Sequence, residues 1–267
     1  MRVTLLSCPI DILSREEAVG RIRQMLQTKG VSHHLLALNS LKVVRALKDQ
    51  AFADYVRQAE LVYADSAGIC WALRFLYGIR QKRIPGVELV QEALGLAHEE
   101  KKGVYLLGAS PQVIEATARY VSRQYPGLHL IGYHHGYLSD TEGKEVLRQL
   151  KELSPDFLAV AMGASLQERW IERIRKEVPI PVCMGVGGSF DILSGRLPRT
   201  PAWMGRMGLE WLFRLARQPQ RIRIMSGLPY FIFLVVRAKV AGPKTTEEQL
   251  ARQKGATPPA PDRLEKG

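Results

Sequence analysis

The chain has 267 residues, 46% of them hydrophobic and 24% charged, which suffices for one large domain or about two small ones and excludes collagen-like, mucin-like and wholly disordered proteins. Its three cysteines, Cys8, Cys70 and Cys183, are far apart and show no CxxC or Cys/His spacing, which argues against a zinc site and fits a reducing cytosol. The net charge of +12 calls for a polyanionic partner, which leaves nucleic acid, an anionic membrane or a phosphorylated substrate as candidates.

Residues 1–194 alternate short strand-like runs with amphipathic, helix-like stretches. Strands are expected over residues 2–7, 33–38, 61–64, 104–107, 129–133, 157–162 and 182–185. Helices are expected over residues 14–26, which open with a Ser14–Glu17 capping box, and over residues 40–48 or 40–59, 68–77, 111–125, 141–153 and 166–176. This alternation predicts an α/β, Rossmann-like fold with a mainly parallel sheet and helices on both faces. Residues 1–10 lack the apolar core of a signal peptide, so export is not expected.

The positive charge is concentrated in residues 195–240, which hold nine basic residues and one acid, a net charge of +8. The apolar run 228–236 in this segment is too short to span a bilayer, which needs about 20 apolar residues. Arginines interleaved with Trp and Phe predict a helical, membrane-associating appendage on the 1–194 core. A buried C-terminal helix with a solvated basic face is the alternative, and no nucleic-acid-binding signature is present. Residues 241–267 are expected to form a disordered tail.

Small and polar residues follow the predicted strands. Ligands of an open parallel sheet bind beyond the carboxyl ends of its strands, where helix N-termini offer N–H groups to phosphate. No GxGxxG or Walker sequence is present, so the fingerprints for NAD and ATP fail. The candidate binding residues after the strands are Asn39, Asp65, Gly108, Ser110, Gly163, Gln167, Glu168, Gly187, Gly188, Ser189 and Asp191.

Several of these side chains have a structural alternative. Asp65 and Asn39 stand where a helix N-cap is expected, although Asp65 could also be a general base that deprotonates a hydroxyl group. Arg83 is either a solvated loop charge or a phosphate clamp. Glu168 stands at a helix start, where the helix dipole favours an acid in any case.

The sequence His134-His135-Gly136-Tyr137 raises the question of a metal. Adjacent histidines rarely ligate one ion together without a carboxylate or a further histidine nearby, so no metal site is expected here. Tyr137 could instead stack on a base.

Longer strings carry a family resemblance. The densest are VGGSFDILSGRLPRTPAWM (186–204), GLEWLFRL (208–215) and QPQR (218–221), supported by RIPG (83–86), YLLG (105–108), YPG (125–127), HHGY (134–137) and GASLQERW (163–170). Over about residues 3–224 the chain resembles the WecG/TagA/CpsF family of bacterial glycosyltransferases. The resemblance implies an inverting enzyme without metal or other cofactor. It would transfer N-acetylmannosamine or its uronic acid from a UDP donor to undecaprenyl-diphosphate-linked GlcNAc, for teichoic acid, common antigen or capsule synthesis.

The resemblance also implies roles for individual residues and a location. Asp65 resembles the family's catalytic base, and Asn39 and Gln167 resemble polar residues of the acceptor and sugar pocket. Arg83 resembles a positively charged wall of that pocket. The arginines that resemble those of an appendage closing over the diphosphate and touching the membrane are Arg214, Arg221 and Arg223. The implied location is the bacterial cytoplasm, peripheral on the inner face of the cytoplasmic membrane.

If the donor is a UDP-sugar, the chain backbone could approach the nucleotide closely at the small residues Gly187, Gly188 and Ser189. Asp191 could then accept a ribose hydroxyl and Tyr137 could stack on uracil. The chain departs from the family pattern at Ala37, where threonine is usual, at Ser66, where glycine is usual, and at Ser165 and Ile224. These departures leave the identity of the sugar and of the acceptor open. The sequence also does not decide whether the protein is a monomer, a dimer or a trimer.

Two rivals use the same fold. One is a non-catalytic module that binds a nucleotide-sugar or a nucleic acid, because a fold alone does not establish catalysis. The other, a nucleotide-dependent oxidoreductase, lacks its glycine fingerprint.

Overall fold

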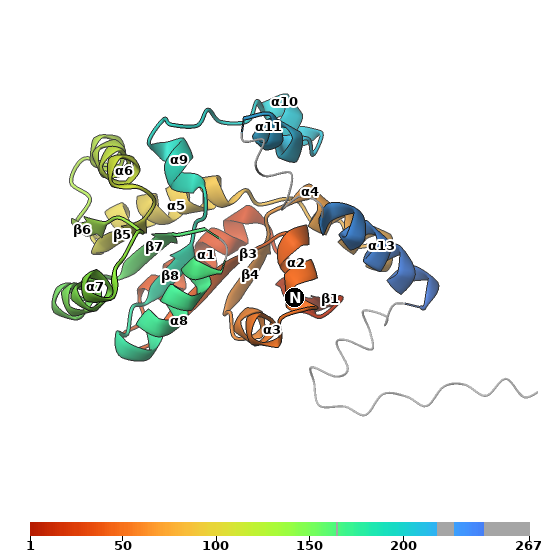
Figure 1. The fold of residues 1–267 in the computed structure, drawn as a ribbon, viewed down its shortest axis with the longest axis horizontal. Coiled ribbons are helices and arrows are strands. Elements are labelled where there is room, and N and C mark those ends of the chain that lie inside the picture. The colour runs from red at the N-terminus through yellow and green to blue at the C-terminus, as the bar shows by residue number, and fades with distance from the viewer. Residues whose placement is uncertain (164, 218–226, 243–267) are drawn as a thin grey trace, which may run out of the picture.

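The computed structural model describes residues 1–163, 165–217 and 227–242, and a parallel six-stranded sheet lies at its centre (Figure 1). The strand order is β4-β3-β8-β7-β5-β6, and every neighbouring pair is parallel. The strands are β3 (His33–Leu38), β4 (Leu61–Ala64), β5 (Val104–Gly108), β6 (Leu130–His134), β7 (Phe157–Ala161) and β8 (Val182–Gly185). The predicted Rossmann-like α/β architecture is confirmed.

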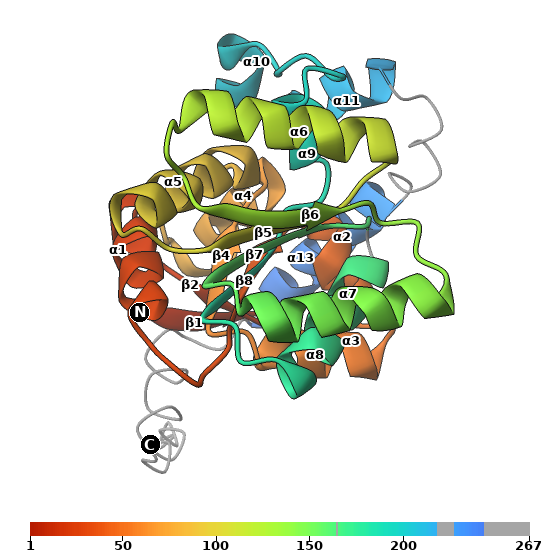
Figure 2. The same ribbon diagram turned by 90° about the vertical axis from the view of Figure 1, so that its left-hand side faces the viewer.

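The two faces of the sheet are covered by different sets of helices (Figure 2). One face packs against α1 (Arg15–Leu26), α5 (Gly86–Glu99), α6 (Pro111–Gln124) and α9 (Ser189–Leu193). On the other face, α7 (Asp140–Leu153) and α8 (Leu166–Glu177) cover β5, β7 and β8. The remaining half of that face is covered by α2 (Ser40–Ala46), α3 (Gln50–Arg57), α4 (Ala67–Tyr77) and a β-hairpin. Alternate residues of the strands enter opposite cores, as the two-residue period of a strand requires.

The hairpin corrects one prediction. Residues 2–7 do not form one strand of the main sheet, because β1 (Arg2–Leu5) turns back into β2 (Cys8–Asp11) as a separate antiparallel pair. Asp11 connects this pair to the sheet, because its carboxylate accepts a hydrogen bond from the amide N–H of Val62 at 2.9 Å. The same carboxylate forms ion pairs with Arg2 at 2.7 Å and with Arg21 at 3.1 Å. The hairpin is therefore bound to β4 by a buried charge.

Two helix predictions also change. The stretch 40–59 is two helices, because Asp49 caps a new helix by accepting the amide of Phe52 at 3.0 Å. Residues 86–99 form helix α5, which is not among the helices expected from the sequence. Pro85 stands directly before this helix. Proline is common both at the end of one element and at the start of a helix, so its presence alone does not predict α5.

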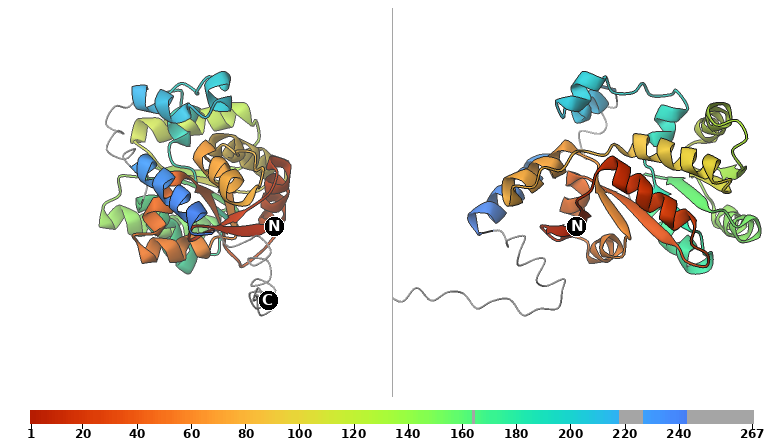
Figure 3. Two further views of the ribbon diagram at one scale, coloured as in Figure 1. Left: turned by 90° about the vertical axis from the view of Figure 1, so that its right-hand side faces the viewer. Right: turned by 180° about the vertical axis from the view of Figure 1, so that it is seen from behind.

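The C-terminal segment is helical, as predicted, with α10 (Ala202–Arg206), α11 (Glu210–Arg217) and α13 (Gly227–Val240). Helix α13 packs beside α2 and α4, and it buries Phe231 and Val235 in the core formed with these helices (Figure 3). Among the residues that the structure describes, none of the helices combines the length and apolarity needed to cross a bilayer. The side chain of Arg214, the residues Arg221 and Arg223, and nearly all of the predicted tail lie outside what the structure describes.

Candidate functional site

The predicted loops all lie at one edge of the sheet, because every strand of a parallel sheet ends on the same side. The loops after β3, β8 and β7 are direct neighbours, and they carry Asn39, Gly187 and Gln167. Asp65 follows β4 at one side of the sheet, and Tyr137 lies just beyond β6 at the other. Neighbouring strands are about 4.8 Å apart, so these outermost strands lie on the order of 24 Å from each other. A ligand that touches both must be elongated.

Asn39 and Asp65 both stand where a helix N-cap is expected, but only Asn39 is one in the structure. Asn39 is the N-cap of α2, and its side chain accepts the amide of Lys42 at 3.0 Å. Asp65 is not the N-cap of α4, because Ser66 holds that position and accepts the amide of Ile69. The departure from the family pattern at Ser66 thus supplies the cap.

The carboxylate of Asp65 instead meets the start of another helix. It accepts the amide of Gly86, the first residue of α5, at 2.9 Å. The partial positive charge at a helix N-terminus favours a carboxylate in that place. Tyr63 lies beneath, wholly buried, and its pKa is raised well above the usual range by burial and by the charge of Asp65. Asp65 is therefore held in a fixed position at the end of β4.

Arg83 connects this part of the site to the C-terminal segment. Its guanidinium forms a short ion pair with Glu210 at the start of α11, and both side chains are about one-fifth exposed. A β-carbon added at Gly208 would stand 3.0 Å from that of Ala67, so the turn before α11 lies against the first residue of α4. Residues 208–210 therefore sit beside the helix that follows Asp65.

Gln167 is buried and joins two of the loops. Its Oε1 accepts the amide of Gly187 at 2.9 Å, which connects the helix after β7 to the loop after β8. Gly185 makes room for this contact, because a β-carbon there would lie 2.5 Å from Nε2 of Gln167. Gly187 itself has a φ of 52°, which favours glycine.

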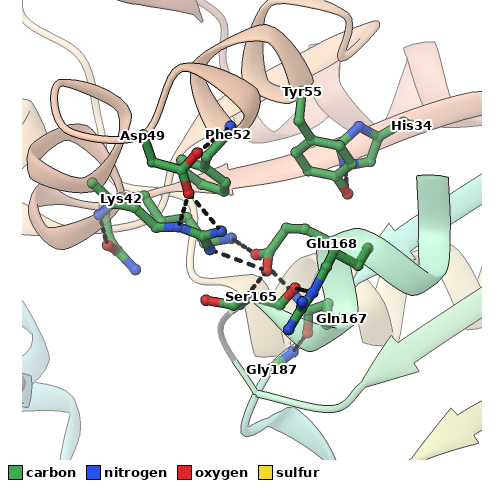
Figure 4. Close-up of polar contacts among 12 residues, drawn as sticks. His34, Lys42, Asp49, Phe52, Tyr55, Ser165, Gln167, Glu168 and Gly187 are labelled. Atoms are coloured by element: carbon green, nitrogen blue, oxygen red, sulfur yellow. Dashed lines mark hydrogen bonds and ion pairs between the residues drawn. The ribbon is translucent and has the colours of Figure 1, made fainter.

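Glu168 lies inside the protein and is only 3% exposed. Its carboxylate accepts the amide of Ser165 at 2.6 Å and pairs with Lys42 at 3.2 Å and Arg45 at 3.7 Å, both on α2 (Figure 4). The sequence predicts a substrate-binding role for Glu168 and gives no sign of the two cations. In the structure, this carboxylate joins α8 to α2, the helix that Asn39 caps.

The loops after β5 and β6 meet through backbone contacts. Gly108 has a φ of 128°, and a β-carbon there would lie 2.2 Å from the carbonyl oxygen of Ala161, so the position requires glycine. Ser110 caps α6 by accepting the amide of Val113, and the amide of Gly136 donates to the carbonyl of Ala109 at 2.9 Å. Tyr137 follows this contact and is 74% exposed, so its ring is available to a ligand.

The remaining predicted residues surround the start of α9. Gly188 precedes the helix, and Ser189 is buried with its hydroxyl donating to the carbonyl of Val186 at 2.7 Å. Asp191 is partly exposed and lies 3.9 Å from Arg196. Gly163 is exposed after β7 with a φ of 76°. Ser189 therefore supports the loop, whereas Asp191 and Gly163 face outward at the site edge.

Comparison with known proteins identifies the family of the chain. The model of the Glycosyl transferase WecG/TagA/CpsF family matches residues 3–245. A Bacillus subtilis (strain 168) protein named N-acetylglucosaminyldiphosphoundecaprenol N-acetyl-beta-D-mannosaminyltransferase is 34% identical over 192 residues, which cover 72% of this chain and 74% of the relative. A protein of the same name from Staphylococcus aureus (strain MW2) is 30% identical over 239 residues, 89% of this chain and 93% of the relative. The chain therefore belongs to the WecG/TagA/CpsF family of glycosyl transferases.

Proposed function

We propose that this glycosyl transferase moves an N-acetylmannosamine-like sugar from a UDP donor to undecaprenyl-diphosphate-linked GlcNAc, with inversion and without a metal ion. The names of the Bacillus and Staphylococcus relatives support this sugar and this acceptor. The observation that carries the mechanism is the placement of Asp65, which ends β4 with its carboxylate fixed by the amide of Gly86. The product would enter a cell-surface polysaccharide of the teichoic acid, common antigen or capsule type.

Asp65 acts as the general base in this proposal. Inverting transfer needs one carboxylate, which takes the proton from the acceptor hydroxyl as that oxygen attacks the sugar on the side opposite the departing UDP. The hydrogen bond from Gly86 fixes the orientation of the carboxylate before the acceptor arrives. Asn39 and Gln167, held by the Lys42 amide and by Gly187, contact the sugar and the acceptor from the neighbouring loops.

The leaving diphosphate requires positive charge. Guanidinium groups suit phosphate oxygens because they donate two parallel hydrogen bonds. Arg83 lies at the carboxyl edge of the sheet, the same edge as Asp65. Its ion pair with Glu210 places the C-terminal segment beside it. We assign the rest of the compensating charge to Arg214, Arg221 and Arg223, and to the N–H groups at the starts of the helices along this edge.

The nucleotide occupies the other end of the site in this proposal. Four glycines leave the backbone free of side chains, so that the pyrophosphate can approach closely: Gly108, Gly163, Gly187 and Gly188. Two serines, Ser110 and Ser189, hold the starts of α6 and α9 in place. Asp191 accepts a ribose hydroxyl and Tyr137 stacks on uracil. Glu168 supports the sugar side from behind through its ion pairs with Lys42 and Arg45. The elongated arrangement suits a donor and an acceptor that meet between β4 and β8.

We further propose that the protein binds the inner face of the bacterial cytoplasmic membrane. Helices α4 and α13 contain no acidic residue, and together they expose Trp71, Phe75, Ile232 and Phe233 to 38–57%. Lys239 lies over the Phe75 ring at 5.8 Å, so a cation stands within this aromatic surface. Aromatic side chains beside Lys and Arg favour an anionic lipid interface. Residues 195–240 would then form the appendage that joins the 1–194 core to the membrane.

The test is a transfer assay with purified protein, a panel of UDP-sugars and a GlcNAc-diphosphate lipid, read by mass spectrometry. One new sugar of N-acetylhexosamine mass on the lipid is expected, and transfer at saturating donor should continue in EDTA. A strict need for Mg²⁺ or Mn²⁺ would overturn the metal-free mechanism. If the protein were instead a non-catalytic module that binds a nucleotide-sugar or a nucleic acid, no donor would be consumed. Binding to nucleic acid would then weaken steeply as the salt concentration rises.

A further inference from the structure

His134, His135 and Glu142 form a cluster at the end of β6 that the transfer mechanism does not use. One ligand atom from each of the three residues lies within 4.8 Å of the other two. Nε2 of His135 is 3.8 Å from Oε1 of Glu142. Two adjacent histidines rarely bind one ion without a carboxylate or a further histidine nearby, and for this reason no metal site is expected from the sequence. The fold supplies that carboxylate from the first turn of α7.

The hydrogen bonds around the cluster leave one ring nitrogen of His134 and one oxygen of Glu142 available to a metal ion. Nδ1 of His134 lies 2.9 Å from the carbonyl oxygen of His135, which only an N–H can satisfy, so Nε2 of His134 carries the lone pair. Metal-binding histidines generally donate their other ring N–H in this way. Glu142 divides its oxygens, because Oε2 accepts the amide and hydroxyl of Ser139, at 2.8 and 2.6 Å, while Oε1 is turned to His135.

We propose that His134, His135 and Glu142 bind a divalent transition-metal ion of the zinc type. Two imidazoles and one carboxylate are a set of three protein ligands that zinc accepts, with water as the fourth. Bonds of about 2.1 Å in a tetrahedral site place ligand atoms roughly 3.4 Å apart, close to the observed separation of His135 and Glu142. Mg²⁺ and Ca²⁺ prefer all-oxygen ligands, so this set discriminates against them.

The site has a structural consequence. It would join the end of β6 to the start of α7, and both ends of the intervening loop carry a ligand. That loop contains Tyr137, and the amide of Gly136 within it is bound to Ala109. A bound ion would therefore fix the position of the exposed Tyr137 ring. The ion would affect the transfer reaction only through Tyr137, since neither the base nor the arginines belong to the cluster, and metal binding can be measured without the reaction.

The experiment is Zn²⁺ titration of tag-free protein by calorimetry, with no nucleotide present. One ion per chain is expected, and His134→Gln, His135→Gln and Glu142→Gln should each weaken binding at least about tenfold. Glutamine at position 142 preserves the capping box, so the fold is retained. The matched controls are Glu17→Gln, in the equivalent capping box of α1, and His129→Gln, an exposed histidine just before β6. Both should bind like the unmodified protein.

Substitution of Co²⁺ for Zn²⁺ gives an independent readout. Visible d–d absorption of a four- or five-coordinate ion is expected, and it should disappear in His135→Gln but not in His129→Gln. Failure of the unmodified protein to bind Zn²⁺ stoichiometrically, or equal binding by all five variants, would overturn the proposal. Mg²⁺ should produce no heat at the same concentrations.

Discussion

Gln167 accepts the amide of Gly187 at 2.9 Å, and the bond holds together two loops from adjacent strands. Gln167 is almost fully buried, so its side chain is held in place before any ligand binds. Its position depends on Gly185, where any β-carbon would overlap its amide group. The arrangement of the sugar side of the proposed site thus depends on the glycine that ends strand β8.

Gly185→Ala should lower the kcat/KM of sugar transfer by about tenfold to a hundredfold, because it displaces Gln167 and the Gly187 loop while leaving Asp65 untouched. Steady-state assays with the lipid acceptor measure this effect. The control is Gly20→Ala on α1, where no atom lies within 4 Å of an added β-carbon. That variant should retain activity and gain about 0.5–1 kcal/mol of stability. Equal activities for the two variants would refute the role given to Gly185.

Glu168→Gln should reduce the free energy of unfolding by about 3 kcal/mol, because it leaves Lys42 and Arg45 without their buried carboxylate. Urea denaturation measures the change. The comparison is Glu172→Gln on the same helix, whose ion pair with Lys176 is exposed and should matter by less than about 0.5 kcal/mol. If both substitutions cost the same, Glu168 is not a structural link between α8 and α2.

Local chemistry predicted much of the framework. The Ser14–Glu17 capping box and the β-branched and leucine-rich runs predict α1 and most strands at their observed places. The position of helix α5 was missed because Pro85-Gly86 has the composition of a turn, yet it begins a helix. That omission also hid the partner of Asp65, since the amide that binds its carboxylate belongs to Gly86.

The long-range relationships could not be predicted from the sequence. Glu168 and Lys42 are far apart along the chain, and nothing local distinguishes Glu168 from any acid in the first turn of a helix. The same holds for Glu142, whose proximity to His135 depends on how the loop after β6 turns into α7. The edge of the sheet at which the candidate residues gather was predictable, because parallel strands share it. Which side chains are buried there was not.

Asp11→Asn should destabilise the protein by about 2 kcal/mol at pH 7, and the difference should shrink in acid. Burial raises the pKa of Asp11, but hydrogen bonds from Arg2 and the Val62 amide and the charges of Arg2 and Arg21 outweigh it, so the pKa is lowered overall. The stabilisation is present above the unfolded pKa of about 3.9 and is lost as the pH falls through the folded value. Urea unfolding at pH 7 and near pH 3 provides the measurement. An unchanged difference at both pH values would contradict this assignment.

Phe233→Ser should weaken binding to vesicles of anionic phospholipid by about tenfold, since more than half of this side chain is exposed on α13. Co-sedimentation at low and high salt measures the loss. Tyr133→Ser, which changes an aromatic side chain of similar exposure on β6, serves as the control and should bind normally. Equal binding of both variants would place the membrane contact elsewhere.

The most direct test of the central claim is Asp65→Asn in the transfer assay. Asparagine retains an oxygen that can accept the Gly86 amide, so the variant should fold and bind UDP normally, while transfer to the GlcNAc-diphosphate lipid should fall by about a hundredfold or more. Asp156→Asn is the matched control, because Asp156 accepts the amide of Gly103 at 2.8 Å just before β7, at the opposite end of the sheet. The account predicts near-normal turnover for Asp156→Asn and almost none for Asp65→Asn. Transfer by Asp65→Asn at the rate of the unmodified enzyme would contradict it.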